Sequence, residues 1–551
     1  MQYVSHPLIY PNTIEDREYQ RRIVEVAKDK NTMVILPTAL GKTIISLLLT
    51  VNILYNYRDK RVLIMAPTRP LCIQHKDTFQ KIVRLPQDDF TLLTGRVSSE
   101  FREVVWKGSS RIIFATPQVV RNDILMRGLK LSDFGLLVFD ECHRAVKEYA
   151  YTEIAQHYMK NSDYPLILGM TASPGSNIER VKMVCESLFI EHIEYRCEND
   201  SDVKPYIKPI HLEWKSVDLP LQYQPLRDIL KGMLNERLKW LQSKGYLKSI
   251  SRVTRKQLIE LGDELRYNIE MGIEEERGPI YQAIMQQSSA LTLFHMLELL
   301  ETQGAYTLKV FMERMKSDNK KIHEMIMKEN LYKELLNLLN GKCYAEHPKV
   351  ELLKRVVKDQ LNLNPNSRIL VFTQYRDTAT YLIEELNKIN NVKAERFVGQ
   401  TTKFGDKGLT QEQQVSLIND LRKGYLNTLV ATSIAEEGLD IPEVDLVIFY
   451  EPIPSEIRYI QRRGRTGRRT AGRVIILVTN DTHDKIYLYA SSKRVEKMRN
   501  IVIKLNKILK PILRVRPQAN PMTQEEILRI QNTIGLKEQL STSNGLFKTL
   551  K

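Results

Sequence analysis

The sequence predicts an α/β protein built from two doubly wound parallel sheets with an all-α helical insertion between them. Short apolar runs alternate with helical segments up to about residue 213, the pattern then becomes continuously helical, and the alternation resumes near residue 346. Strands that alternate with helices are typical of a parallel sheet covered by helices on both faces. We therefore expect an N-terminal α/β domain (1–213), a helical insertion (214–345), a C-terminal α/β domain (346–495) and a basic helical tail (496–551).

The composition is that of a large, basic, globular protein. A chain of 551 residues exceeds what one hydrophobic core usually supports, and 42% hydrophobic residues are ample for several cores. There are 82 Lys and Arg against 66 Asp and Glu, which gives a formal charge of +16. This excess favours a polyanionic partner such as nucleic acid.

The cysteines and the apolar runs both indicate a cytoplasmic protein. Five cysteines are scattered along the chain without a Cys-x-x-Cys pair, so neither a disulfide framework nor a zinc site is indicated. The longest apolar stretch, Ile44 to Tyr55, is far shorter than the roughly 18 residues of a membrane helix. Residues 1–20 lack a basic segment followed by an apolar one. We expect no membrane span and no signal peptide.

The first candidate for a ligand site follows an apolar strand over residues 32–36. The run Pro-Thr-Ala-Leu-Gly-Lys-Thr (37–43) then opens an apolar helix. Backbone N–H groups of such a loop face phosphates, Lys42 would neutralise the β and γ oxygens, and the Thr43 hydroxyl can ligate Mg²⁺. The general motif begins with Gly, whereas this chain has Leu36. The nucleotide-binding residues of the loop would be Thr38, Gly41, Lys42 and Thr43.

A pair of carboxylates forms the second candidate site. The apolar run Leu136 to Phe139 reads as a buried strand, and it ends in Asp140-Glu141-Cys142-His143. Nucleotides bind at the carboxyl edge of parallel sheets. Asp140 would hold Mg²⁺ directly or through water, and Glu141 would orient and deprotonate the water that attacks the γ-phosphate. The two candidates together predict a site for ATP and Mg²⁺.

Three further apolar runs, at residues 61–66, 111–115 and 165–169, read as strands of the same sheet. Each is followed by a short polar turn. The turn after residue 169 contains Thr171-Ala172-Ser173, whose hydroxyls could bridge the nucleotide site and a neighbouring domain.

The segment after residue 215 has the period of amphipathic helices. Its first apolar positions recur every 3 or 4 residues, and Ala290 to Leu300 is dense enough to be the centre of a small bundle. The basic residues between Lys244 and Lys256 read as a solvated loop. The apolar positions of the first helix are Leu226, Ile229, Leu230, Met233, Leu234, Leu238 and Leu241.

A second set of strands is predicted at residues 368–373, 428–431 and 446–450, with a βα unit through Arg396 to Gln400. It leads into Gln461 to Arg468, which has four arginines in eight residues. Taken alone, this stretch reads either as a phosphate clamp or localisation signal, or as a solvated charge run.

The order of these motifs resembles that of the superfamily 2 helicases, whose two RecA-like domains sandwich ATP and grip a nucleic-acid strand. Within them the chain resembles the archaeal Hef helicases and their FANCM relatives from about Tyr19 to Ser491. The stretches that carry this closer resemblance are Ile190 to Arg196, Leu300 to Gly304, Arg396 to Gln400 and Phe449 to Ser455. The helical insertion also looks like theirs.

The resemblance assigns further residues. Gln20 would read the adenine edge, Gly438 and Asp440 would lie at the nucleotide, and Gln461, Arg465 and Arg468 would belong to the catalytic set. Arg465 and Arg468 would reach the γ-phosphate as arginine fingers. The candidate nucleic-acid contacts, which would grip phosphates and sugars without reading sequence, are Arg69, Thr94, Thr116, Thr373 and Thr432.

The resemblance implies an ATP-driven DNA helicase or translocase that acts on forks and junctions in repair. Two departures stand against the family pattern: Ala39 replaces a loop glycine, and the Glu-Arg-Lys-x-x-x-Asp nuclease signature is absent. These departures leave open a nucleotide-gated platform that recruits a nuclease. A second alternative is an RNA-directed ATPase, because related helicases with helical insertions bind double-stranded RNA.

The C-terminal stretch is basic with interspersed apolar residues. We expect residues 493–516 to form a helix that packs onto the second sheet. A short apolar cluster at Gly545 to Leu550 could dock a sliding clamp or another repair partner.

Overall fold

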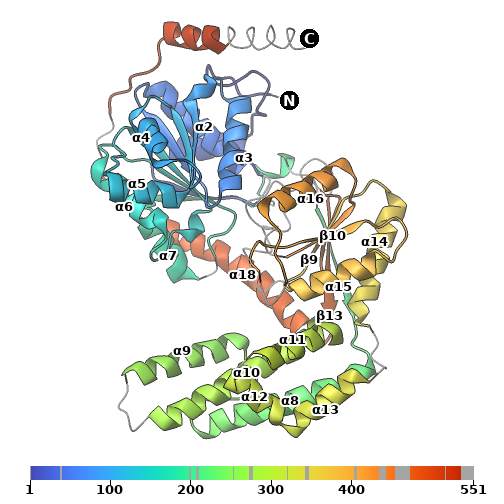
Figure 1. The fold of residues 1–551 in the computed structure, drawn as a ribbon. Coiled ribbons are helices and arrows are strands. Elements are labelled where there is room, and N and C mark those ends of the chain that lie inside the picture. The colour runs from blue at the N-terminus through green and yellow to red at the C-terminus, as the bar shows by residue number, and fades with distance from the viewer. Residues whose placement is uncertain are drawn as a thin grey trace.

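The computed structural model consists of two α/β domains, a helical insertion and a C-terminal segment that returns to the first domain (Figure 1). The described residues are 2–37, 40–175, 177–197, 200–206, 210–251, 253–271, 277–318, 320–341, 346–402, 406–432, 442, 444–452, 472–514 and 517–534.

The N-terminal domain is a seven-stranded, fully parallel sheet in the order β3-β4-β2-β5-β6-β1-β7. Helices cover both faces, as in a doubly wound fold. The strands are β1 (Thr32–Ile35), β2 (Arg61–Met65), β3 (Phe90–Leu93), β4 (Ile112–Ala115), β5 (Phe134–Asp140), β6 (Ile167–Thr171) and β7 (His192–Tyr195). The helices are α1 (Glu18–Ala27), α2 (Lys42–Asn56), α3 (Arg69–Ile82), α4 (Ser99–Lys107), α5 (Pro117–Arg127), α6 (Ala150–Asn161) and α7 (Ile178–Ser187).

Apolar runs with no polar alternation form this sheet because both of its faces are buried. In β1, Val34 belongs to the core on one face, while Met33 and Ile35 belong to the core on the other. Successive strand residues point to opposite faces, so a run such as 33–35 feeds both cores.

The C-terminal domain is a six-stranded parallel sheet in the order β10-β11-β9-β12-β13-β8. Its edge strand β8 comes from the segment that leaves the N-terminal domain, so the expected boundary at residue 213 falls inside it. The strands are β8 (Ile210–Val217), β9 (Ile369–Phe372), β10 (Ala394–Phe397), β11 (Thr428–Ala431), β12 (Leu446–Phe449) and β13 (Gly472–Thr479). The helices are α14 (Pro348–Leu363), α15 (Arg376–Leu386) and α16 (Gln411–Lys423).

The insertion is all helical and lies below the two sheets in the view of Figure 1. Its core contains the apolar face of α8 and the dense run of α10, which confirms the bundle centred on Ala290 to Leu300. The helices are α8 (Gln224–Ser243), α9 (Arg255–Met271), α10 (Arg277–Thr302), α11 (Ala305–Ser317), α12 (Lys321–Lys328) and α13 (Asn330–Asn340).

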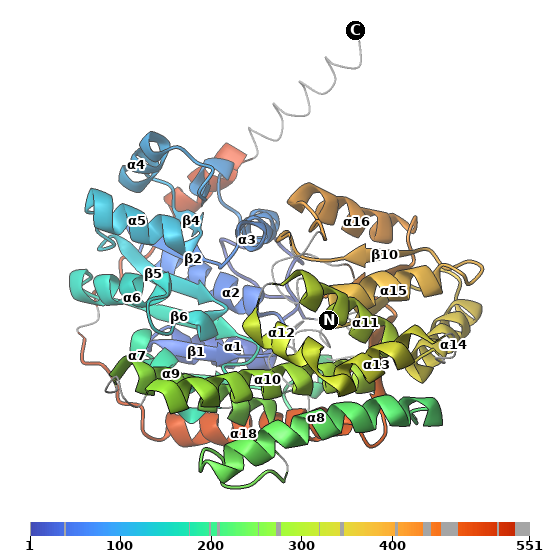
Figure 2. The ribbon, with the colours of Figure 1, turned by 60° about the horizontal axis from the view of Figure 1, so that its bottom comes forward.

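The helix α18 (His483–Asn506) crosses from the second sheet to the N-terminal domain, as both views show (Figures 1 and 2). The expectation that the basic stretch packs onto the second sheet is wrong for its later half. Ile501 and Leu505 are buried in the core of the N-terminal domain. They lie there because β7 leaves an open sheet edge that the helix covers.

The chain after α18 continues around the N-terminal domain. Arg514 donates to the Asn31 side chain, and the Asn520 amide donates to the Asn56 carbonyl. Met522 is buried in the core beside α2, and a helix over residues 524–534 follows it. The C-terminal segment therefore contacts the first domain at two places, near the start of β1 and at the end of α2.

Candidate nucleotide and nucleic-acid site

The candidate residues of the first domain converge at the carboxyl edge of its sheet. Leu36 and Pro37 follow β1, Asp140 ends β5 with Glu141 next to it, and Thr171 ends β6. Because β5, β6 and β1 are neighbours in the sheet, these three segments meet. This edge is where parallel α/β sheets bind ligands.

Gly41 shapes the turn that starts α2. Its φ is +78°, a left-handed conformation that glycine adopts without strain. A Cβ at this position would lie 2.5 Å from Gln20 Nε2. That amide and the Tyr19 hydroxyl both donate to the Leu40 carbonyl, at 3.2 and 2.7 Å. The buried α1 side chains therefore fix the loop from behind, and only glycine fits against them.

Lys42 and Thr43 begin α2, at the end of the helix where backbone N–H groups point outward. Lys42 Nζ donates to the Leu36 carbonyl at 3.0 Å. Thr38 and Ala39 lie outside the described residues, so the effect of the alanine on the loop stays a prediction.

Asp140 is 6% exposed and both of its carboxylate oxygens accept hydrogen bonds. His75 Nε2 lies 2.8 Å from Oδ2, and the Glu141 amide donates to Oδ1 at 3.0 Å. Burial raises the pKa of Asp140, but the His75 hydrogen bond and the nearby charges of His75 and Lys42 outweigh it and lower the pKa. Asp140 is thus held as an anion beside Lys42.

Glu141 has φ +50° and ψ +46°, an uncommon conformation for a residue other than glycine. The His143 ring lies 3.3 Å from its Oε2, and His143 Nδ1 lies 3.0 Å from the Thr171 hydroxyl. Thr171 Oγ1 in turn donates to the Ser173 carbonyl. The carboxylate pair and the Thr-Ala-Ser turn therefore form one connected polar site.

The charged groups of this site fit a magnesium nucleotide. Oε2 of Glu141 is buried and makes no hydrogen bond to the described residues, and its only ion-pair contact among them is with His143 Nδ1 at 3.3 Å, so it can also accept from a water. The described residues hold no cluster of three metal-ligating side chains. Mg²⁺ does not need one, because it is usually bound by one or two carboxylates together with substrate phosphates.

The candidate nucleic-acid contacts also follow strand ends. Thr94, Thr116, Thr373 and Thr432 come directly after β3, β4, β9 and β11, and Arg69 begins α3. Thr94, Thr373 and Thr432 are buried, and Arg69 and Thr116 are half-buried. The three buried threonines would therefore contact a nucleic-acid strand mainly through their backbone groups. Gly438, Asp440, Gln461, Arg465 and Arg468 lie outside the described residues.

Sequence reasoning missed three residues of the site: His75, Tyr19 as a partner of the loop, and Met498 of α18. Met498 Sδ lies 3.0 Å from the Ser173 hydroxyl. None of the three stands in a local motif with its partner. His75 is 65 residues from Asp140 and Met498 is 325 residues from Ser173, so folding alone brings them together.

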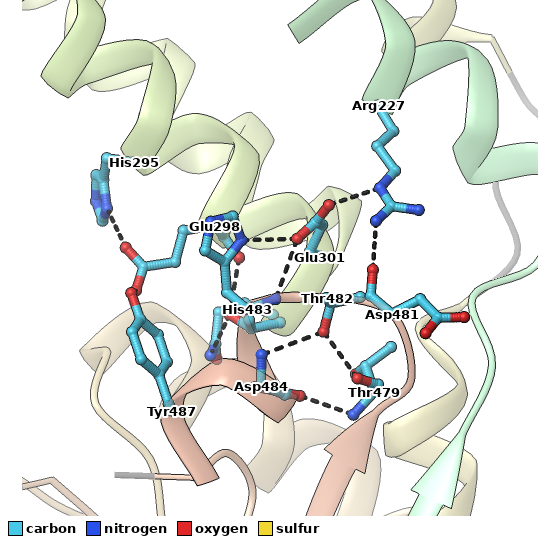
Figure 3. A network of polar contacts seen from close by, with 12 residues as sticks. Arg227, His295, Glu298, Glu301, Thr479, Asp481, Thr482, His483, Asp484 and Tyr487 are labelled. Carbon is cyan, nitrogen blue, oxygen red and sulfur yellow. Dashed lines mark hydrogen bonds and ion pairs between the residues drawn. The ribbon is translucent and has the colours of Figure 1, made fainter. Parts of the chain in front are cut away.

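The insertion is joined to the C-terminal domain by a buried polar network, which we call the α10–α18 network (Figure 3). Glu301 of α10 accepts from Arg227 at 2.6 Å and lies 2.7 Å from His483 Nδ1. Glu298 accepts from the Tyr487 hydroxyl at 2.6 Å. Both carboxylates are less than 5% exposed. These buried charged and polar side chains therefore link the insertion to the C-terminal domain.

Comparison with known families covers most of the chain. Residues 17–181 match the "DEAD/DEAH box helicase" family and residues 348–470 match the "Helicase conserved C-terminal domain". Residues 222–343 match the family described as "Putative ATP-dependent RNA helicase, helical bundle". Each family covers one of the three units of the fold.

A solved structure decides the subgroup. The Hef helicase domain of Pyrococcus furiosus is 41% identical, with a TM-score of 0.65 over 88% of this chain and 100% of that one. The chain belongs to the Hef and FANCM group of superfamily 2 helicases. Its two sheets are the RecA-like domains of that group, with a helical bundle between them.

Two curated relatives show both substrate classes in their names. A Methanocaldococcus jannaschii protein named "Putative ATP-dependent RNA helicase" is 40% identical over 92% of this chain. The Drosophila melanogaster "DEAD-box ATP-dependent DNA helicase Fancm" is 33% identical over 91%. This Hef-type chain spans 64% of the first and 36% of the second. Within its described residues, no helix has both the length and the apolarity to cross a bilayer.

Proposed function

We propose that this chain is an ATP-dependent DNA helicase or translocase that acts on branched DNA. The observation that carries the proposal is the polar site at the sheet edge, where Lys42 and the Asp140–Glu141 pair adjoin the start of α2. The similarity to the Fancm protein supports DNA as the substrate.

The nucleotide would lie on the loop before α2, with its phosphates toward Lys42 and the helix N-terminus. Bound Mg²⁺ supplies charge neutralisation at the phosphates, and Thr43 and Asp140 would hold it. Glu141 would accept a proton from the attacking water, for which its buried Oε2 is available. Closure of the second domain would bring Arg465 and Arg468 to the γ-phosphate, with the nearby Gln461 in the same set.

The bound DNA strand would cross the carboxyl edges of both sheets. The candidate contacts lie there: Arg69, Thr94, Thr116, Thr373 and Thr432. Phosphate contacts of this kind hold a strand without reading its sequence. Preference for forks and junctions would come from the insertion, which the α10–α18 network fixes beside the second sheet. A nuclease or sliding clamp would be a separate partner.

The test is ATP turnover with forked DNA, linear duplex DNA and duplex RNA, each at two salt concentrations, with Lys42→Ala as the inactive control. We expect the strongest stimulation with forked DNA. Equal stimulation by forked and linear duplex DNA would contradict the proposed preference for branched DNA. Stimulation by duplex RNA alone would show that RNA, and not DNA, is the substrate.

The second candidate is an RNA-directed ATPase, which the name of the M. jannaschii relative and the family of the helical bundle favour. The same panel separates the two. A third outcome, tight DNA binding with no turnover and an unaffected Glu141→Gln variant, would indicate a binding platform that recruits a nuclease.

A further inference from the structure

His75 holds the candidate metal-binding carboxylate from a different element. It lies on α3, about 9 Å along the helix axis from Arg69. Its ring is 4% exposed, and Nε2 is 2.8 Å from Asp140 Oδ2, whose side chain is also buried. The contact therefore forms inside the domain, where a hydrogen bond is shielded from water.

The two ring nitrogens have different surroundings. Nδ1 is buried and has no hydrogen-bond partner among the described residues. Nε2 lies 2.8 Å from Oδ2 of Asp140, and because a carboxylate oxygen accepts, the proton on Nε2 is donated to it.

We propose that His75 is a positioning residue that fixes the Asp140 carboxylate for Mg²⁺. It is not placed as a metal ligand, because Nε2 is already directed at Oδ2 of Asp140. With Oδ1 held by the Glu141 amide and Oδ2 by His75, the plane of the carboxylate is set before the metal arrives. Partners of this kind typically change metal affinity by about 10–100-fold when they are removed. The inference rests on the proposed nucleotide site.

The test uses the full chain and measures binding, so it does not depend on turnover. A fluorescent ADP analogue is titrated with Mg²⁺, and the metal midpoint is compared among variants. His75→Leu has a similar volume and no donor, and we expect its midpoint to rise about tenfold. His75→Gln keeps an N–H at a similar reach, so its midpoint should stay within about threefold of the wild type.

A third variant, His75→Asn, separates loss of the hydrogen bond from the effect of an apolar side chain. Asparagine is polar but one bond shorter than glutamine, so its amide should not reach Asp140. Its Mg²⁺ midpoint should therefore match that of the leucine variant. Nucleotide binding without Mg²⁺ should be the same in all the variants. An unchanged midpoint in His75→Leu or His75→Asn would overturn the proposal, and so would a glutamine variant as weak as the leucine one.

The same titration distinguishes a failure of the proposed nucleotide site from a failure of the role of His75. A wild-type chain that binds the analogue with no dependence on Mg²⁺ would contradict the proposed nucleotide site itself. A wild-type chain with a clear midpoint and variants that share it would contradict the role of His75 alone.

Discussion

Gly41 makes the phosphate loop sensitive to a single methyl group. Gly41→Ala should weaken nucleotide binding strongly, because a left-handed φ costs a residue with a Cβ about 1 kcal/mol and the methyl would also lie 2.5 Å from Gln20 Nε2. Relief of that contact must move Gln20 off the Leu40 carbonyl or shift the loop. The measurement is affinity for the fluorescent ADP analogue together with the melting temperature.

Gly128 is the matched control for this substitution. It has φ +63° at the end of α5, and a Cβ there would meet no atom within 4 Å. Gly128→Ala should therefore show the backbone penalty without loss of nucleotide affinity. Equal affinity in both variants would contradict the role assigned to Gly41.

Arg465 and Arg468 carry the second prediction. Arg465→Ala and Arg468→Ala should each lower ATP turnover by about 10³-fold, because arginine fingers stabilise the charge that develops at the transferred phosphoryl group. DNA affinity should stay within a few-fold of the wild type, and the slope of affinity against salt should not change. A loss of affinity with turnover preserved would instead make this stretch a phosphate clamp.

The residues found from sequence are those that stand in one local run. Lys42 and Thr43 begin the helix that follows β1, and Asp140 ends β5 with Glu141 next to it, so spacing alone predicted their location at the sheet edge. His75 gave no such signal. A histidine in a predicted helix, with no other metal-ligating residue near it in the sequence, is common. Its partner Asp140 lies on a strand 65 residues away.

At the scale of elements, the Asn506 side chain satisfies backbone groups at the open edge of the first sheet, where a further strand would otherwise pair with β7. Its Oδ1 accepts from the Ile193 amide at 2.9 Å and its Nδ2 donates to the Ile193 carbonyl at 3.2 Å. Asn506→Leu should destabilise the N-terminal domain by about 1–3 kcal/mol, because two hydrogen bonds to a part-buried backbone are lost. Hydrogen exchange at the Ile193 amide should become faster, whereas the exposed neighbour substitution Lys507→Ala should leave it unchanged.

The α10–α18 network should make stability sensitive to acid. Burial raises the pKa of Glu301, but the hydrogen bond and charge of His483 and the charge of Arg227 outweigh it and lower the pKa below its ordinary 4.5. A carboxyl with a lowered pKa stabilises the fold fully above the unfolded value, and this contribution is lost as the pH falls through the folded value. The interface should therefore weaken below about pH 4.5.

Glu301→Gln tests this account. The variant should lose on the order of 3 kcal/mol at pH 7, since His483 and Arg227 lose a buried anionic partner. Its stability should then depend less on pH below 4.5 than that of the wild type. Glu260→Gln, at an exposed α9 pair with Lys256, is the control and should change neither value much. A parallel acid profile in the two glutamine variants would contradict the assignment.

Most strands were expected, and so were the all-helical character of the insertion, its first helix and the central run of α10, because long periodic or apolar runs are strong local signals. β8 was missed although Leu212 and Trp214 alternate with polar residues, since its partner β13 comes long after it in sequence. The basic stretch that contains the end of α18 was expected on the second sheet, which is wrong for its later half. Its apolar positions show which face is buried and not which domain buries it.

At the scale of the molecule, several contacts join the insertion to the C-terminal domain, and we expect the two to move as one body. Besides the α10–α18 network, the Thr307 and Thr378 hydroxyls lie 3.2 Å apart, and Arg314 of α11 pairs with Asp377 of α15. We expect a cross-link between cysteines in Thr307→Cys and Thr378→Cys to leave DNA-stimulated turnover intact, provided that exposed native thiols are removed. A cross-link that stops turnover would show that the insertion moves against the second sheet during the cycle.

The placement of the domains could not be predicted from sequence. It depends on contacts such as Ser173 with Met498 and Ile193 with Asn506, each more than 300 residues apart. The three units and their order could be predicted, because each has its own local pattern. How α18 ties them together depends on surfaces that exist after each unit has folded.

The position of β8 also sets an order of events during synthesis. Glu213 of β8 pairs with Arg473 of β13, 260 residues later in the chain. At a translation rate of about 5–20 residues per second, β8 waits for tens of seconds before its partner leaves the ribosome. The insertion helices, whose contacts are local, can fold in that interval. The second sheet is therefore completed after the insertion, and a nascent chain held at residue 450 should leave the backbone of β8 open to proteases and chaperones.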